Sequence, residues 1–127
     1  MATGFPSATG DVLSAAMYNG LVNFTLNDQT GTTYQPVLND QYQVLVTRSN
    51  AAASTMVIPT NATTAFPVGT CITVLNKGAG LVSVSGAVGV TILSAGAVAA
   101  IPTLAQYKSC AIMQVAANIW YVVGAIG

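Results

Sequence analysis

The sequence predicts an all-β fold: an antiparallel β-sandwich or jelly-roll-like module of about eight to nine short strands, preceded by an N-terminal arm with one short helix. Two observations support this prediction. From residue 32 onward, short apolar runs rich in Val, Ile and Thr alternate with turn sequences at near-regular spacing. Before that point, one stretch has a helical period. We therefore expect an arm over residues 1–31 and a β-sandwich module over residues 32–127.

The arm contains one candidate helix, over residues 11–22. Leu13, Met17 and Leu21 recur at i, i+4 and i+8, so they would form a single apolar stripe. Asp11 is suited to cap the helix, because its carboxylate can accept main-chain N–H groups at the helix start. A helix of about three turns is marginal alone. We expect the stripe to dock, either on the chain's own β module or on a neighbouring subunit or another protein.

The module divides into short strands separated by turn residues. The expected strands are Thr32–Leu38, Tyr42–Thr47, Thr55–Ile58, Cys71–Leu75, Leu81–Ser85, Val90–Leu93, Val98–Ile101, Ser109–Val115 and Ile119–Val123. We expect the first two to pair through an Asn39-Asp40 turn, and the last two to form a hairpin through Ala116-Ala117-Asn118. Gly78-Ala79-Gly80 is interpreted as a further hairpin turn.

Charged residues are scarce in this chain. Only 5% of residues are charged and 53% are hydrophobic, with three Lys or Arg, three Asp, and neither Glu nor His. An ordinary soluble domain is about 25% charged. A net charge of zero without a basic cluster gives no electrostatic basis for nucleic-acid binding. Such a chain is prone to associate, and residues 44–46 and 119–123 are apolar at successive positions. These features predict a homo-oligomer.

Two stretches without charge, residues 78–107 and 109–127, are long enough to be considered as membrane spans. Glycines and Pro102 interrupt the first stretch, and Leu81–Ser85 alternates with a period of two. Both stretches are therefore interpreted as chains of strands, and we expect no membrane segment. The first twelve residues contain neither a basic residue nor an apolar run, so we expect no signal peptide.

The side chains that usually carry catalysis are few. There is no His or Glu, and the Asp residues lie in the arm or in turn-like sequence, so we expect no enzyme, no cofactor and no metal site. The alternative is a two-carboxylate glycosidase site formed by Asp28 and Asp40. Cys71 and Cys110 lie within strand-like runs and are expected to be free, buried thiols. A disulfide would require their Cα atoms to approach within about 7 Å.

Two parts of the chain resemble known phage proteins. Asp11-Val12-Leu13-Ser14-Ala15-Ala16, leading into Tyr18-Asn19, resembles the short helical entry of many structural proteins of tailed bacteriophages. Residues 55–86 resemble the β module of phage head-decoration, head-fibre and tail-fibre proteins, with Ile58-Pro59 and Phe66-Pro67-Val68-Gly69-Thr70 as the matching turns. The closing hairpin, with Asn118 before Ile119-Trp120-Tyr121-Val122, also fits, so this resemblance covers roughly residues 32–127. These motifs mark strands and turns and carry no chemistry.

The resemblance implies a trimeric virion protein that binds the major capsid protein on the capsid surface, after assembly in the host cytoplasm. An arm with one β module favours a compact capsid decoration (cement) or head-fibre protein. The alternative is a tail-fibre or tail-tip adhesin that binds a host-surface receptor. The residues expected to contact the capsid or other copies are Phe5, Leu13, Met17, Tyr18, Leu21, Trp120 and Tyr121.

Overall fold

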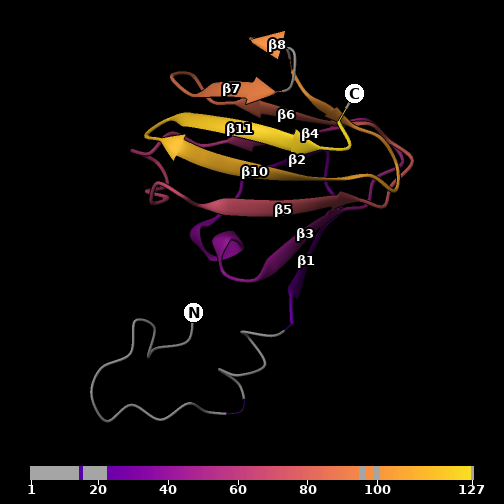
Figure 1. The fold of residues 1–127 in the computed structure, drawn as a ribbon. Helices are drawn as coiled ribbons and strands as arrows, with labels where there is room; N and C mark the ends of the chain where they lie inside the picture. The colour runs from indigo at the N-terminus through magenta and orange to yellow at the C-terminus, as the bar shows by residue number, and fades with distance from the viewer. Residues whose placement is uncertain (1–14, 16–22, 95–96, 99–100, 127) are drawn as a thin grey trace.

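The computed structural model describes residues 15, 23–94, 97–98 and 101–126, which form two β-sheets (Figure 1). The larger sheet, sheet A, has the strand order β1-β3-β5-β10-β11-β7-β8. Its strands are β1 (Thr25–Gln29), β3 (Val44–Arg48), β5 (Cys71–Asn76), β7 (Thr91–Ser94), β8 (Ala97–Val98), β10 (Ser109–Ala116) and β11 (Ile119–Gly124). Sheet B has the order β2-β4-β6-β9. Its strands are β2 (Thr33–Tyr34), β4 (Ser54–Ile58), β6 (Val82–Gly86) and β9 (Thr103–Leu104).

From β1 to β7 the chain winds as a coil, because it crosses between the sheets after every strand. Strands β1, β3 and β5 are consequently parallel in sheet A, and β2, β4 and β6 are parallel in sheet B. The β10–β11 hairpin enters sheet A between β5 and β7, with β10 antiparallel to both of its neighbours. In Figure 1 the hairpin, coloured gold to yellow, lies beside the earlier strand β5.

From β3 to β6 the stacked strands of both sheets keep one offset along the chain, which is longer than the offset between β1 and β3. Leu45 lies beside Thr73 in sheet A and Ser54 lies beside Val82 in sheet B, and the separation along the chain is the same for both pairs. The connecting turns stack as well, because the Gly80 N–H donates to the Asn50 carbonyl at 2.9 Å. A Cβ atom at Gly80 would lie only 1.9 Å from the Ala52 carbonyl oxygen, so this stacking requires glycine.

The core lies between the sheets and is built by alternation along each strand, since successive side chains point to opposite faces. Its buried apolar residues are Val44, Val46, Met56, Ile58, Phe66, Ile72, Val74, Val82, Val84, Leu104, Cys110, Ile112, Trp120 and Val122. The rings of Phe66 and Trp120 pack edge to face, with their centroids 5.5 Å apart. Among the described residues, no helix is both long and apolar enough to cross a membrane.

The all-β prediction is confirmed, and so is the final hairpin, in which Asn118 adopts a positive φ of 60°. The expected antiparallel pairing is wrong for five of the nine strand pairings within the described residues, because the coil makes four pairings parallel and the inserted hairpin places β11 parallel to β7. Asn39 and Asp40 do not form a hairpin turn. They lie in the 3-10 helix η1 (Leu38–Gln41), which connects sheet B to sheet A.

Two further expectations need correction. Gly78-Ala79-Gly80 does not close a hairpin, because it joins β5 in sheet A to β6 in sheet B. Strand β1 falls within residues 1–31 and pairs with β3, so the strand-forming part of the chain begins before residue 32. The helix expected over residues 11–22 lies outside the described residues, apart from Ala15.

Candidate interaction face

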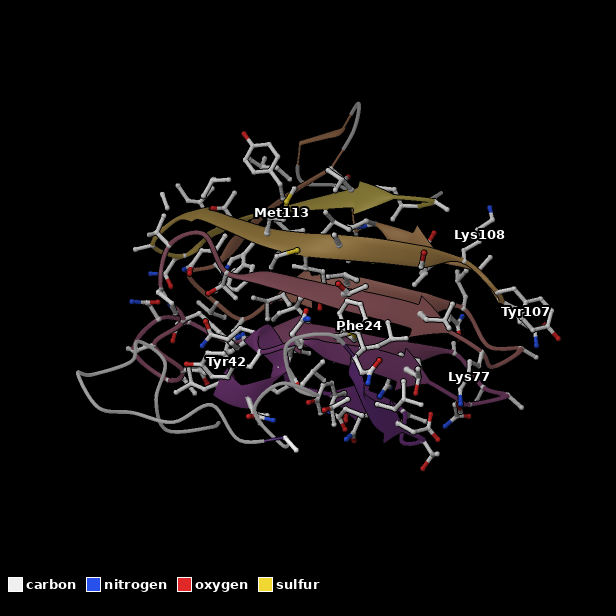
Figure 2. The ribbon with its side chains drawn as sticks, turned by 60° about the horizontal axis from the view of Figure 1, so that its bottom comes forward. Phe24, Tyr42, Lys77, Tyr107, Lys108 and Met113 are labelled. Carbon is white, nitrogen blue, oxygen red and sulfur yellow. The ribbon has the colours of Figure 1, made fainter. Side chains whose placement is uncertain are left out.

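The outward-pointing side chains of sheet A form a mainly apolar surface, which we call face A. Its residues point outward because their neighbours along each strand are buried in the core. One register row consists of Leu26, Leu45, Thr73, Ala111 and Val123, and the next consists of Cys71, Met113, Tyr121 and Leu93. Several of these side chains are well exposed, with Leu26 at 68%, Tyr121 at 41% and Val123 at 40%. Figure 2 looks toward this side of the sheet, with Met113 on β10.

The charges near face A gather at one end, where β1, β3 and β5 finish. The Asp28 carboxylate accepts hydrogen bonds from Thr47 Oγ1 at 2.7 Å and Ser49 Oγ at 2.8 Å, and Lys77 Nζ lies 3.5 Å away. These hydrogen bonds, with a smaller contribution from Lys77, hold the pKa of Asp28 below its usual value. Lys108 lies at the same end (Figure 2). The two register rows named above contain no charged residue, whereas the third outward row, at the charged end, consists of Asp28, Thr47, Leu75 and Ser109.

The outward side of sheet B, which we call face B, has a different chemistry. Thr33, Thr55, Ser83 and Thr103 are aligned across its four strands in one register row. Hydroxyl groups remain hydrated without cost, whereas exposed apolar groups do not. The protein therefore has one face that water solvates well and one that favours burial.

The two carboxylates proposed for a glycosidase site do not come together. Asp40 is buried, accepts hydrogen bonds from Tyr34 Oη and from Asn27 Nδ2 at 2.9 Å, and also accepts the Val37 N–H. Asn27 and Asp28 are consecutive in β1, so their side chains point to opposite faces of sheet A. Burial, reinforced by Asp40, raises the pKa of Tyr34. The hydrogen bonds of Asp40 therefore hold the loop before β3 in place. Asp28 and Asp40 do not form a two-carboxylate site.

Both cysteines are free thiols, and they lie in different environments. Cys110 points into the core, where burial raises the pKa of its thiol to about 11. Cys71 is exposed and belongs to face A, beside Met113. The expectation that both thiols are buried is therefore wrong for Cys71, because the alternation of β5 turns it outward. Among the described residues, no group of three or more His, Cys, Asp or Glu side chains is placed to hold a metal ion.

The contact residues expected from the sequence are only partly placed by the structure. Phe5, Leu13, Met17, Tyr18 and Leu21 lie outside the described residues. Trp120 is 1% exposed and packs against Phe66, so it is a core residue and offers no contact surface in the folded chain.

Tyr121, the next residue along β11, lies on face A. The sequence interpretation missed Leu26 and Met113, because their place on the same face depends on the order of strands in sheet A.

No protein-family model, curated protein or solved structure matches this chain. What the protein does is therefore inferred from its surface and its sequence.

Proposed function

We propose that the protein is a structural component of a phage virion, a capsid decoration (cement) or head-fibre protein that acts as a homotrimer on the capsid surface. The observation that supports this best is the contrast between the two faces, since face A is apolar and face B carries a row of hydroxyls. A protein with these two faces is suited to bury one side against protein and present the other to water.

The gain from covering face A favours a role in assembly. Fully burying one large apolar side chain that was fully exposed contributes about 1.5–3 kcal/mol, and face A offers a part of this gain at each of Leu26, Tyr121 and Val123, which are 68%, 41% and 40% exposed. Exposed apolar patches of this kind mark sites of association. The separation of Asp28 and Asp40 adds support for a role without catalysis.

The proposed mechanism is mechanical. Association of copies through their β modules brings several N-terminal arms together, and each arm contacts the major capsid protein through Phe5, Leu13, Met17, Tyr18 and Leu21. Several weak contacts that are linked in this way bind far more tightly than one contact alone. The trimer would bridge neighbouring capsid subunits and stabilise the shell, with no cofactor and no nucleic acid involved.

A second candidate function is that of a tail-fibre or tail-tip adhesin, and one observation favours it. Tyr107 is 79% exposed in the turn before β10, and it lies at the same end of the molecule as Lys77 and Lys108 (Figure 2). An exposed aromatic ring beside cationic groups is suited to contact a polar ligand on a cell surface.

Co-sedimentation separates the two candidates. The purified protein is mixed with phage particles that lack it, or with host cells, and the bound fraction is measured after centrifugation. Saturable binding to the particles, with a fixed number of copies per particle, would support the decoration function. Binding to cells alone would favour the adhesin, and binding to neither would contradict both.

A further inference from the structure

We infer that face A is the surface through which copies of this chain associate, with face A of each copy turned toward the shared axis of the trimer and buried against the other two copies. The inference rests on the proposed self-association and adds the surface that produces it. Three properties of face A support other copies of this chain as its occupant: the lack of charge in its rows through Leu45 and Tyr121, its size and its side chains.

The charge pattern allows the same face to meet itself. The rows through Leu45 and Tyr121 contain no charged residue, so two apposed copies of face A bring no like charges together at the centre. Asp28 and Lys77 already neutralise each other within one copy, 3.5 Å apart at the end of the face. A partner that binds through strong charge complementarity would find no matching pattern here.

The size of face A approaches what a stable interface needs. Neighbouring strands lie about 4.8 Å apart, and each strand rises about 3.3 Å per residue. Sheet A has seven strands, and its long strands have five or six residues. Its flat outline therefore measures roughly 30 by 18 Å. The solvent-accessible area of face A is larger than this flat outline, because the side chains make the surface uneven. A specific interface covers roughly 800 Å² on each partner, so face A is large enough to form most of one.

The side chains of face A are those that protein interfaces favour. Aromatic residues and Met are enriched at interface centres, where charged residues are depleted. Tyr121 and Met113 lie directly beside each other near the middle of sheet A, with Cys71 on the far side of Met113. Face B lacks this pattern, since its central row consists of Thr and Ser.

A matched pair of variants of the full chain tests the inference. Tyr121→Lys places a charge at the centre of face A, and Thr55→Lys places the same charge at an outward position of face B. Circular dichroism first establishes that both variants fold. Analytical ultracentrifugation over a concentration series is then expected to show association at least about tenfold weaker for Tyr121→Lys, and unchanged for Thr55→Lys.

Labelling of Cys71 in the unsubstituted protein provides a second test that does not depend on a variant. Because Cys71 belongs to face A, its reaction with a thiol reagent should slow about tenfold when nine molecules in ten are associated. Cys110 serves as the internal control, because it is buried at every concentration. Rapid labelling of Cys71 in the associated state would overturn the inference.

The remaining outcomes are decisive as well. A protein that stays monomeric at high concentration overturns the inference. If Cys71 is protected in that monomer and becomes reactive when residues 1–22 are deleted, the chain's own N-terminal segment covers face A instead. If copies associate but Thr55→Lys alone disrupts them, face B is the interface. None of these measurements uses phage particles, so their failure is distinguishable from failure to bind a capsid.

Discussion

Arg48 and Asn76 are register partners on the neighbouring parallel strands β3 and β5, and both are fully buried where these strands end. Arg48 reaches back to the preceding turn, where Nη1 donates to the Gln29 carbonyl at 3.3 Å and Nη2 donates to the Gly31 carbonyl at 2.8 Å. Arg48 and Asn76 thus occupy equivalent positions of the coil, and both side chains bind main-chain groups of the turns. Apolar side chains at these positions would leave those main-chain groups unpaired.

Replacement of Asn76 is expected to be strongly destabilising. Its Nδ2 donates to the carbonyls of Gly80 and Leu104, both at 2.9 Å, and its Oδ1 accepts the Gly78 N–H at 3.0 Å. Asn76→Ala leaves these groups without their partner and should lower the free energy of unfolding by about 3 kcal/mol. Asn39→Ala, at an exposed position, is the matched control and should change it by less than about 0.5 kcal/mol. Urea unfolding measures both, and equal effects would contradict the role of Asn76.

The stacked turns make Gly80 sensitive to a single methyl group. In Gly80→Ala the new Cβ would lie 1.9 Å from the Ala52 carbonyl oxygen, so one turn must move away from the other. We expect a loss of about 3 kcal/mol or more. At Gly31 the nearest atom to a new Cβ is the Thr33 carbonyl oxygen at 3.6 Å, which is ordinary contact, so Gly31→Ala should be tolerated. Thermal unfolding of the two variants decides the matter, and a stable Gly80→Ala protein would show that the turns are not held in contact.

Asp28 should make stability depend on pH in the acid range. Its pKa in the folded protein lies below 3.8, chiefly because Thr47 and Ser49 donate hydrogen bonds to the carboxylate. A lowered carboxyl pKa contributes stability that is fully present above the unfolded value and is lost as the pH falls through the folded value. Asp28→Asn should therefore reduce stability at pH 6, and the difference from the unsubstituted protein should shrink as the pH falls below 3.8. A difference that stays constant down to acid pH would argue against this role.

The adjacent aromatic residues Trp120 and Tyr121 should respond to substitution in opposite ways. Trp120→Ala removes a core side chain that packs against Phe66, and it should lower the free energy of unfolding by about 3–5 kcal/mol. Tyr121→Ala removes an exposed side chain, so its effect on unfolding measured in dilute solution should be small. Circular dichroism in a denaturant series reports both, and a larger effect at Tyr121 would contradict the assignment of inward and outward faces.

The sequence was sufficient to predict strands because alternation and turn residues are local signals. Thr55–Ile58 and Cys71–Leu75, expected from the sequence, match β4 and β5 within one residue. The parallel coil was not predictable, because it depends on which strands meet after a full circuit of the chain. The stretch from β3 to β4 shares few identical residues with the equivalent stretch from β5 to β6, such as Val46 and Val74, so no clear internal repeat reveals the coil.

The candidate site shows the same division between local and non-local information. That residues 119–123 have two apolar sides was visible in the sequence, and Tyr121 was expected at a contact. Trp120 lies in the same apolar run as Tyr121, so the sequence does not distinguish the two residues. Only the fold shows that the core lies on the Trp120 side of β11. Cys71, Met113 and Leu26 come from strands that are distant in the chain, so their common surface depends on the strand order of sheet A.

The coil sets how this fold tolerates insertions and deletions. Circuits of different length already stack, because the offset along the chain is shorter between β1 and β3 than between β3 and β5, so one further whole circuit would add a strand to each sheet and keep inward positions inward. Within a strand, an insertion of a single residue would move the residues of that strand beyond the insertion from the core side to the solvent side and the reverse. Longer descendants of this chain are therefore expected to arise by duplication of whole circuits, and shorter changes to accumulate in the turns.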